Sequence, residues 1–226
     1  KAAGLNFNSV WASTGYPMDM IELMHLRKES TDDFMIAGSD CSGIVYRTGK
    51  HVTRVKPGDE IVVQAGWYDM QEQWIKNGGD PSFAKSGRAW GYETSWGSFA
   101  QFCKVKEMQC LSKPKNLSWD EAAVYMLSGA TVYRMLFKYP PHTVQPGDVV
   151  LIWGGAGGLG TMAIQLVKMA GGTPIVVVSS SEKEHYCSSL GALVINRKEF
   201  NHWGALMHGS LMPDTQEIWR SQAKLF

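Results

Sequence analysis

The sequence predicts an α/β protein in which a β-rich block precedes a parallel sheet of the doubly wound, nucleotide-binding type. Three observations lead to this fold class. Short strand-like runs separated by turns fill the first half of the 226 residues. Later, residues 149–152 (Val-Val-Leu-Ile) form an apolar run too short for a helix, followed by a glycine cluster and a helix-like pattern. A second apolar run, residues 175–178 (Ile-Val-Val-Val), comes after that helix, as a buried parallel strand does.

The first block, residues 1–117, has the pattern of short strands joined by loops. Residues 38–49 predict a strand that leads into a turn, and residues 60–63 (Glu-Ile-Val-Val) predict another after a Pro-Gly-Asp turn. Residues 64–90 are polar and rich in glycine and tryptophan, which indicates a long excursion from the sheet. Residues 97–105 alternate apolar and polar side chains, which predicts a half-buried strand.

A linking helix is predicted next. Ser118 and Glu121 fit a capping box, with serine as the N-cap and glutamate three residues on. The helix is expected to run from Ala122 to about Lys138. Residues 145–148 (Gln-Pro-Gly-Asp) then form the turn that precedes the nucleotide unit.

In that unit, Gly155, Gly157 and Gly160 fit the G-x-G-x-x-G pattern, a turn that lets backbone amides approach a pyrophosphate. The following helix is expected to begin near Gly158 and to direct its positive N-terminal end at the phosphates. Gly158 and Leu159 lie inside the same turn and are expected to contact the cofactor. The alternative is a glycine turn that binds no ligand.

The end of the second strand favours NADPH over NADH. An NAD-binding unit places an acid about twenty residues beyond the glycines, where it binds the ribose hydroxyls. This sequence has Ser179 and Ser180 there instead, with Lys183 close behind. Small hydroxyls and a cation suit a 2′-phosphate, and Glu182 fits the first turn of a helix. The alternative for Lys183 is a solvated helix residue.

The sequence after the second strand indicates an incomplete sheet. Residues 182–190 predict a helix and residues 192–196 a third short strand, whereas residues 197–226 follow no pattern that places them. Three strands are about half of a doubly wound sheet. We therefore expect a fragment of a longer chain, with residues 1–120 as one domain and residues 121–226 as the first half of a second. Half a sheet would leave apolar faces uncovered, so we expect the fragment to fold poorly alone.

Composition argues against several classes of partner. A net charge of +1 with 19% charged residues gives no reason to expect nucleic acid or an anionic membrane. No apolar run approaches the roughly eighteen residues needed to span a bilayer. The four cysteines are scattered without a C-x-x-C pair, which predicts neither a disulfide framework nor a structural zinc site. We expect a cytoplasmic protein with no nucleic-acid or membrane partner.

The order of these elements, with its G-x-D-x-x-G and P-G-D turns, resembles the medium-chain dehydrogenase/reductase superfamily. Its members join a GroES-like, β-rich catalytic domain to a Rossmann domain, which is truncated here. Five segments narrow the resemblance to the crotonyl-CoA carboxylase/reductases. They are residues 6–11 (Asn-Phe-Asn-Ser-Val-Trp), 77–81 (Asn-Gly-Gly-Asp-Pro), 90–94 (Trp-Gly-Tyr-Glu-Thr), 131–137 (Thr-Val-Tyr-Arg-Met-Leu-Phe) and 196–200 (Asn-Arg-Lys-Glu-Phe).

The resemblance implies NADPH-dependent reduction of an α,β-unsaturated acyl-CoA such as crotonyl-CoA, with capture of CO2 by the product enolate. It assigns CO2 binding to Asn8, whose amide can donate to a CO2 oxygen, and to the pair Tyr92 and Glu93, with Glu93 holding a water. A histidine of the same site is expected beyond Phe226. The resemblance also adds Arg197 to the cofactor contacts and implies a homo-oligomer, since family members are tetramers.

Alternatives stay open at each catalytic position. Asn8 also fits an Asx-turn and Glu93 an ordinary strand-end residue. Tyr16 follows Gly15, as the proposed proton donor of simpler enoyl thioester reductases follows a glycine, but the alignment is offset by one residue. A buried core tyrosine is the other interpretation of Tyr16.

Alternative functions also remain. No metal is expected, because neither the Gly-His-Glu triplet nor the four-cysteine lobe of zinc alcohol dehydrogenases is present. The competing activities are a plain enoyl-CoA or acrylyl-CoA reductase without carboxylation and a zinc-independent quinone oxidoreductase. A non-catalytic NADPH-binding protein is a further possibility from another class.

Overall fold

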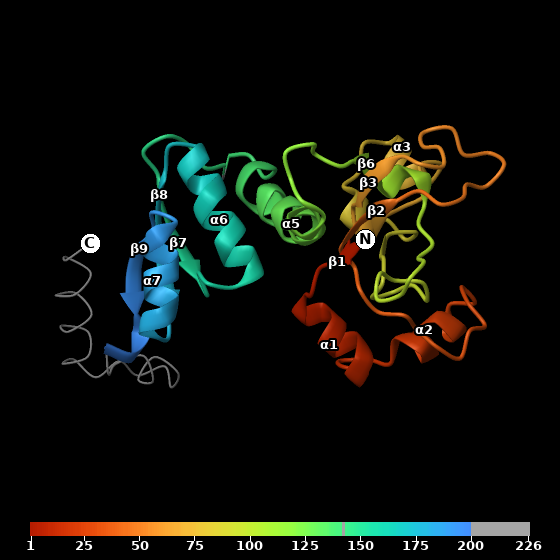
Figure 1. Cartoon of the computed structure of the whole chain (residues 1–226), viewed down its shortest axis with the longest axis horizontal. Coiled ribbons are helices and arrows are strands. Elements are labelled where there is room, and N and C mark those ends of the chain that lie inside the picture. Colours follow the sequence, from red (N-terminus) through yellow and green to blue (C-terminus); the bar gives the residue numbers. More distant parts are fainter. Residues whose placement is uncertain (142, 200–226) are drawn as a thin grey trace. The chain divides into compact units, whose positions relative to one another are not determined.

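The computed structural model describes residues 1–141 and 143–199, and the chain divides into two compact units (Figure 1). The first unit is Lys1–Ala130 and the second begins at Thr131. This division falls within helix α5 (Met126–Phe137). The predicted domain boundary after residue 120 concerns the parent protein and stays a prediction.

The first unit is built on a four-stranded antiparallel sheet in the order β1-β2-β3-β6. Cys41, Val63 and Cys110 are opposite one another across three of its strands and belong to one buried cluster, which Trp90 completes from outside the sheet. The prediction of a strand at residues 60–63 is confirmed. The four strands are β1 (Ala2–Ala3), β2 (Cys41–Ile44), β3 (Glu60–Val63) and β6 (Cys110–Ser112).

The predicted excursion between β3 and β6 contains short elements of its own. Its two strands pair antiparallel, and the Glu72 carboxylate closes the loop between them by accepting from the Lys85 and Ser86 amides, both at 2.9 Å. The hydrogen bond from the Ser86 hydroxyl and these two amide bonds lower the pKa of Glu72. The elements are β4 (Gly66–Trp67), α3 (Gln73–Lys76), η1 (Pro81–Phe83), β5 (Arg88–Ala89) and, just before β6, η2 (Glu107–Gln109).

Two helices near the N-terminus were not predicted: α1 (Phe7–Thr14) and α2 (Met20–Leu26). The first consists of Phe, Asn, Ser, Val, Trp, Ala, Ser and Thr, mostly poor helix formers, and its N-cap makes no side-chain cap bond. The second does carry a sequence signal, because the Asp19 carboxylate accepts from the Ile21 and Glu22 amides.

The strand predicted at residues 97–105 is wrong. The amides of Gly97, Ser98 and Phe99 donate irregularly to the carbonyls of residues 36–38, and no ladder forms. Only an isolated bridge joins Ile36 to Trp96. Close packing of backbone on backbone takes the place of a strand pair.

The single linking helix predicted from residue 122 is also wrong, although its capping box is confirmed. Ser118 Oγ accepts from the Glu121 amide at 3.2 Å and the Glu121 carboxylate accepts from the Ser118 amide at 2.8 Å. The helix begins at Trp119, and α4 (Trp119–Val124) ends before α5 begins. The Leu127 amide, which in a continuous helix would donate to the carbonyl four residues earlier, donates to the Asp40 carboxylate at 3.2 Å.

The second unit contains the predicted parallel sheet, in the order β7-β8-β9. Helices α6 and α7 pack on one face of it, where Ile164 and Cys187 meet Val176 and Val178 (Figure 1). The order strand, glycine turn, helix, strand, helix, strand is confirmed. The elements are β7 (Val149–Trp153), α6 (Gly158–Met169), β8 (Thr173–Val178), α7 (Ser181–Ser189), β9 (Leu193–Asn196) and η3 (Arg197–Glu199).

Strand β7 differs from its neighbour β8. Residues from Pro174 onward in β8 are buried, whereas Val149 and Leu151 of β7 are 65% and 61% exposed. In the described sheet β7 has one hydrogen-bonded neighbour, β8. No helix in the described part of the chain is long and apolar enough to cross a membrane.

Candidate nucleotide site and candidate catalytic turn

The glycine turn between β7 and α6 has the close packing that a nucleotide site requires. Gly157 is the N-cap of α6 and makes no side-chain cap bond, so the first amides of the helix are left for other partners. A Cβ on Gly160 would lie 2.4 Å from the Gly154 carbonyl oxygen and 2.5 Å from that of Gly155. Only glycine therefore lets the helix begin this close to the turn. A Cβ on Gly157, by contrast, would meet nothing nearer than 3.5 Å.

A cavity of about 350 Å³ opens beside this turn, within the second unit. Of the predicted cofactor residues, Gly157, Ser179, Lys183 and Arg197 line it. Within residues 1–141 and 143–199, neither Lys183 nor Arg197 pairs with a carboxylate. Two uncompensated cations beside a helix N-terminus form an anion-attracting end to the cavity.

The other predicted cofactor residues lie around the cavity without lining it. They are Gly155, Gly158, Leu159, Gly160 and Ser180. Gly155 packs against the Val176 side chain and Gly160 against the backbone of the turn, whereas Ser180 is the N-cap of α7 and accepts from the Lys183 amide at 3.4 Å. That bond holds the first turn of α7, and with it Lys183, at the rim of the cavity.

Asn8 lies in the first turn of α1, in the first unit. Its Nδ2 donates to Ser39 Oγ at 2.9 Å, and neighbouring Asn6 donates through its Nδ2 to the Asp40 carboxylate at 3.3 Å. Both asparagines of the Asn-Phe-Asn run therefore point at the two residues that precede β2. Side-chain bonds of this kind, rather than a helix cap, hold the start of α1.

Asp40 is fully buried and links three segments. Besides Asn6, its carboxylate accepts from the Leu127 amide, and its backbone carbonyl accepts from the Gly4 amide at 3.0 Å. Burial raises the pKa of Asp40 to about 6, while the bonds from Leu127 and Asn6 act in the opposite direction. The group fixes the N-terminal segment against the start of α5.

Tyr92 and Glu93 lie in a tight turn after β5. Trp90, which is 2% exposed, anchors this turn through bonds from Nε1 to the carbonyls of Trp96 and Lys104. The Glu93 amide donates to the Ala89 carbonyl at 2.7 Å, and the Ala89 amide returns a bond of 3.0 Å to the Glu93 carboxylate. Glu93 is thus part of a reciprocally bonded turn and not an ordinary strand-end residue.

The segment at residues 38–39 lies against Asn8 and against the turn that bears Tyr92 and Glu93. Asn8 bonds to Ser39, and Gly91, one residue before Tyr92, lies so close to Gly38 that a Cβ there would sit 1.8 Å from the Gly38 carbonyl oxygen. Gly91 also has a φ of 68°, which favours glycine. Residues more than eighty positions apart are therefore brought to adjacent positions of one backbone segment.

Unpartnered polar atoms gather at the same place. Among the described residues, three buried side-chain atoms lack a hydrogen-bond partner: Asn8 Oδ1, Ser9 Oγ and Ser98 Oγ. Ser98 lies against Gly38, since a Cβ on that glycine would be 2.3 Å from its hydroxyl. Buried polar groups normally have partners, so this concentration indicates a place where a polar ligand or water binds.

Tyr16 is 62% exposed, so the interpretation as a buried core tyrosine is wrong. It follows Gly15, the C-cap of α1, and its ring lies 6.3 Å from that of Trp11. No described contact joins it to Asn8 or Glu93. Its proton-donor role stays a prediction.

A second hollow in the first unit, of about 940 Å³, contains none of the predicted site residues. Cys41, Cys103 and Cys110 line it as free thiols. A hydrogen bond with Cys103 and burial both raise the pKa of Cys41. No group of three or more His, Cys, Asp and Glu side chains in the described ranges is arranged to hold a metal ion.

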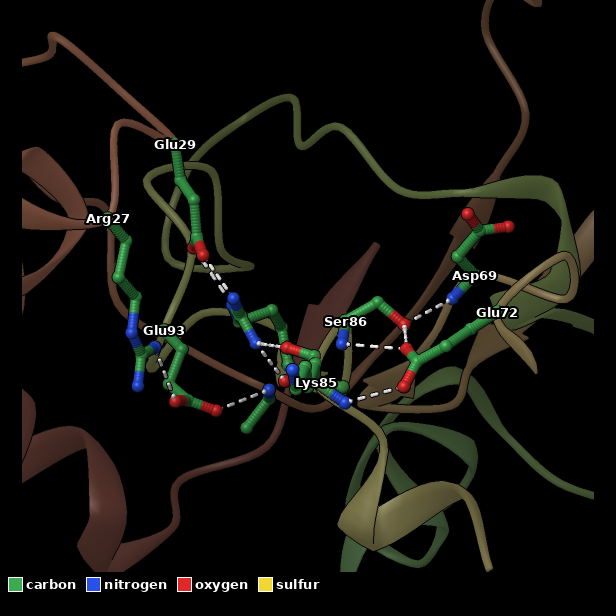
Figure 2. Close-up of polar contacts among 10 residues, drawn as sticks. Arg27, Glu29, Asp69, Glu72, Lys85, Ser86 and Glu93 are labelled. Atoms are coloured by element: carbon green, nitrogen blue, oxygen red, sulfur yellow. Dashed lines mark hydrogen bonds and ion pairs between the residues drawn. The ribbon is translucent and has the colours of Figure 1, made fainter. Parts of the chain in front are cut away.

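Sequence reasoning missed three residues near the candidate CO2-binding groups: Arg27, Ser39 and Asp40. The Gly-x-Asp run at residues 38–40 was a visible signal, because a lone acid between small residues before a strand needs a partner. Arg27 has no comparable signal. It bonds to Glu93, 66 positions away, through Nη1 at 3.3 Å (Figure 2).

Comparison with known proteins identifies relatives along the whole chain. Over its 226 residues it is 45% identical to a crotonyl-CoA carboxylase/reductase of Cereibacter sphaeroides, of which it covers 50%. It matches the structure of the crotonyl-CoA carboxylase/reductase AntE in complex with NADP with a TM-score of 0.86 at 50% identity, covering 100% of this chain and 55% of AntE.

A further solved structure is that of the 2-octenoyl-CoA carboxylase reductase CinF in complex with NADP and 2-octenoyl-CoA. Its TM-score is 0.80 at 42% identity, with 88% of this chain and 46% of CinF covered. The chain therefore spans about half the length of these relatives. The predicted resemblance to crotonyl-CoA carboxylase/reductases is confirmed, as is the predicted fold class.

A match to the alcohol dehydrogenase GroES-like domain covers residues 1–115. With 115 of its 226 residues matched in this way, the chain belongs to the family of proteins that carry the alcohol dehydrogenase GroES-like domain.

Proposed function

We propose that the parent protein of this chain uses NADPH to reduce an α,β-unsaturated acyl-CoA and captures CO2 with the resulting enolate. The observation that carries this proposal is the convergence of Asn8 and the turn bearing Tyr92 and Glu93 on residues 38–39. The relatives are crotonyl-CoA and 2-octenoyl-CoA carboxylase/reductases by name, which supports the same chemistry. The parent is further proposed to act in the cytoplasm as a homo-oligomer.

NADPH fits the cavity of the second unit. The first amides of α6 and the backbone of the glycine turn would hold its pyrophosphate, and Lys183, Arg197 and Ser179 would bind the 2′-phosphate. When bound, the cofactor supplies a hydride to the β-carbon of the substrate. The residues of this chain set its position and its phosphate preference.

In the first unit, Asn8 and Glu93 would divide the handling of CO2 between them. One N–H of the Asn8 amide is used on Ser39 Oγ, which leaves the second N–H to donate to a CO2 oxygen. The Glu93 carboxylate holds a water from its remaining acceptor positions. Tyr92 contributes an aromatic wall next to this carboxylate. The negative charge that develops on the thioester oxygen requires hydrogen-bond donors in the complete site.

The test uses the full-length parent protein with crotonyl-CoA and NADPH, with and without bicarbonate, and weighs the product by mass spectrometry. We expect a product heavier by one CO2 only when bicarbonate is present. Asn8→Ala should lower the ratio of carboxylated to reduced product without slowing reduction. An unchanged ratio in that variant would contradict the role of Asn8.

The second candidate is a plain enoyl-CoA reductase, in which the enolate takes a proton. The exposure of Tyr16 favours keeping this candidate function, because an accessible hydroxyl can exchange its proton with water. Saturated acyl-CoA in both reactions would establish this candidate. NADPH oxidation with a quinone, or NADPH binding without turnover, would point to the two remaining alternatives.

A further inference from the structure

Two ion pairs connect the segment that follows α2 with the strand and turn around β5. Arg88 holds Glu29 through Nε at 2.8 Å and through Nη2, and Arg27 holds Glu93 through Nη1 at 3.3 Å (Figure 2). In sequence, Arg27 lies close to Glu29, and Arg88 lies close to Glu93. The two pairs differ in the other contacts that the carboxylate makes.

Among the described residues, the Glu29 carboxylate has hydrogen bonds to Arg88 alone. Both its oxygens are used on Arg88, an interaction that lowers the pKa of Glu29 and raises that of Arg88. Such two-point pairing fixes one segment to the other. The mechanical connection between the segments is therefore already provided by Arg88.

The Glu93 carboxylate is held in a different way, with one contact on each oxygen. Oε2 accepts from the Ala89 amide at 3.0 Å, and Oε1 accepts from Arg27. The bond to Ala89 alone would let the carboxylate swing about that single point. The second contact fixes its plane, and two of its roughly four acceptor positions stay available.

Stability does not account for the Arg27 contact. The side chains of Arg27 and Glu93 are 36% and 25% exposed, and single ion pairs with this much exposure add little to folding. What the contact does change is the orientation of a carboxylate that lies one residue beyond Tyr92, in the turn whose Gly91 packs against Gly38.

We propose that Arg27 is a positioning residue, which orients the Glu93 carboxylate for its part in CO2 capture. This inference rests on the proposed function and deepens it. Arg27 itself touches neither substrate nor CO2 and acts only through Glu93.

The test compares Arg27→Met with the unaltered full-length protein. Methionine keeps the length and apolar character of the stem but removes the guanidinium. We expect the ratio of carboxylated to reduced product to fall about 3- to 10-fold at limiting bicarbonate, less than for a buried charge-assisted hydrogen bond because this pair is partly exposed. NADPH oxidation without bicarbonate should stay unchanged, and Arg27→Lys should restore part of the ratio. An unchanged ratio in Arg27→Met would overturn the proposal.

Arg88→Met is the matched control, because it breaks the neighbouring pair and leaves both contacts of Glu93 in place. We expect it to lower the melting temperature more than Arg27→Met does, while its product ratio stays within about twofold of the unaltered protein. An equal fall of the ratio in both variants would mean that carboxylation depends on the ion-pair connection between the two segments, and not on the orientation of Glu93.

A second measurement separates this inference from the proposed function. If the unaltered protein forms no carboxylated product, the proposed function fails, but the positioning role is still decided by hydrogen exchange of the Ala89 amide. That amide donates to Glu93, so Arg27→Met should speed its exchange relative to the unaltered protein and to Arg88→Met. Equal exchange rates in all three proteins would overturn the positioning role.

Discussion

The nucleotide turn and the catalytic turn are both built around glycines, but they obtain their geometry in opposite ways. The nucleotide turn is one continuous stretch, in which Gly160 packs against the backbone of Gly154 and Gly155. The catalytic turn depends on side chains from distant segments, with Asn8 on Ser39 and Arg27 on Glu93. A local backbone site should fail abruptly when one atom is added, whereas a site of separate side-chain contacts should lose its function in steps.

The largest effect is expected from Gly160→Ala in the full-length protein. The added methyl would meet two carbonyl oxygens at 2.4 and 2.5 Å, and backbone atoms cannot move away cheaply. We expect a loss of about 2–3 kcal/mol in unfolding free energy, by analogy with overpacked cores, and at least about 100-fold weaker NADPH binding. Denaturant unfolding and fluorescence titration measure the two quantities.

Gly157→Ala is the control for that prediction, since its Cβ would have about 3.5 Å of clearance. It should cost less than about 1 kcal/mol, the usual difference at a helix N-cap. Equal losses in the two variants would show that flexibility of the turn, and not the close approach at Gly160, decides the site.

The next largest effect concerns Asp40, the buried acid on the catalytic side. Its pKa is raised from 3.8 to about 6, so the folded protein binds its proton more tightly than the unfolded chain. Stability from this group is therefore fully present below about pH 4 and is lost as the pH rises to about 6. Between about pH 4 and pH 6 the unaltered protein should lose on the order of 2 kcal/mol of unfolding free energy through this group, and Asp40→Asn should remove that loss. Unfolding curves at pH 4 and pH 7 check this, and an identical slope in both proteins would contradict it.

A smaller effect is expected from the cations of the nucleotide cavity. Lys183→Ala should weaken NADPH binding about tenfold and leave NADH binding unchanged, because only the 2′-phosphate is lost as a partner. Lys168→Ala is the control, as its Nζ donates to the Leu190 carbonyl and does not line the cavity. A parallel loss for both cofactors would remove Lys183 from phosphate recognition.

The smallest effect is expected from Ser39→Ala, which removes the acceptor of the Asn8 amide. One neutral hydrogen bond contributes about 0.5–1 kcal/mol, so the ratio of carboxylated to reduced product should fall about two- to fivefold. Mass spectrometry of the products at limiting bicarbonate measures this ratio. A drop as large as that of Asn8→Ala would show that Ser39 does more than orient the amide.

The same contrast explains what could be read from the sequence. The strand at residues 60–63, the start of α6 at Gly158 and the capping box at Ser118 follow from neighbouring residues, and all three are confirmed. The alternation at residues 97–105 is also local, but it predicted a strand that the close approach to residues 36–38 replaces. That approach is a property of the fold and leaves no periodic signal.

The candidate sites divide along the same line. Gly157, Ser179 and Lys183 were predicted from the local pattern and Arg197 from the family resemblance, and all four line one cavity because they lie at or just after the ends of consecutive parallel strands. Asn8 and Glu93 came from family resemblance alone. Nothing in the pattern around Arg27 indicates its contact with Glu93, since an arginine at the end of a short helix is ordinarily solvated.

Strand β7 has a practical consequence for any work on this stretch of chain. It has one neighbour in the described sheet, and Val149 and Leu151 point outward. Within the described residues, β7 is therefore an apolar strand with one open edge, and such an edge is a template for pairing with further chains. Protein expressed from these 226 residues alone is therefore expected to accumulate in inclusion bodies or grow into aggregates as its concentration rises, and biochemical work should begin with the longer parent.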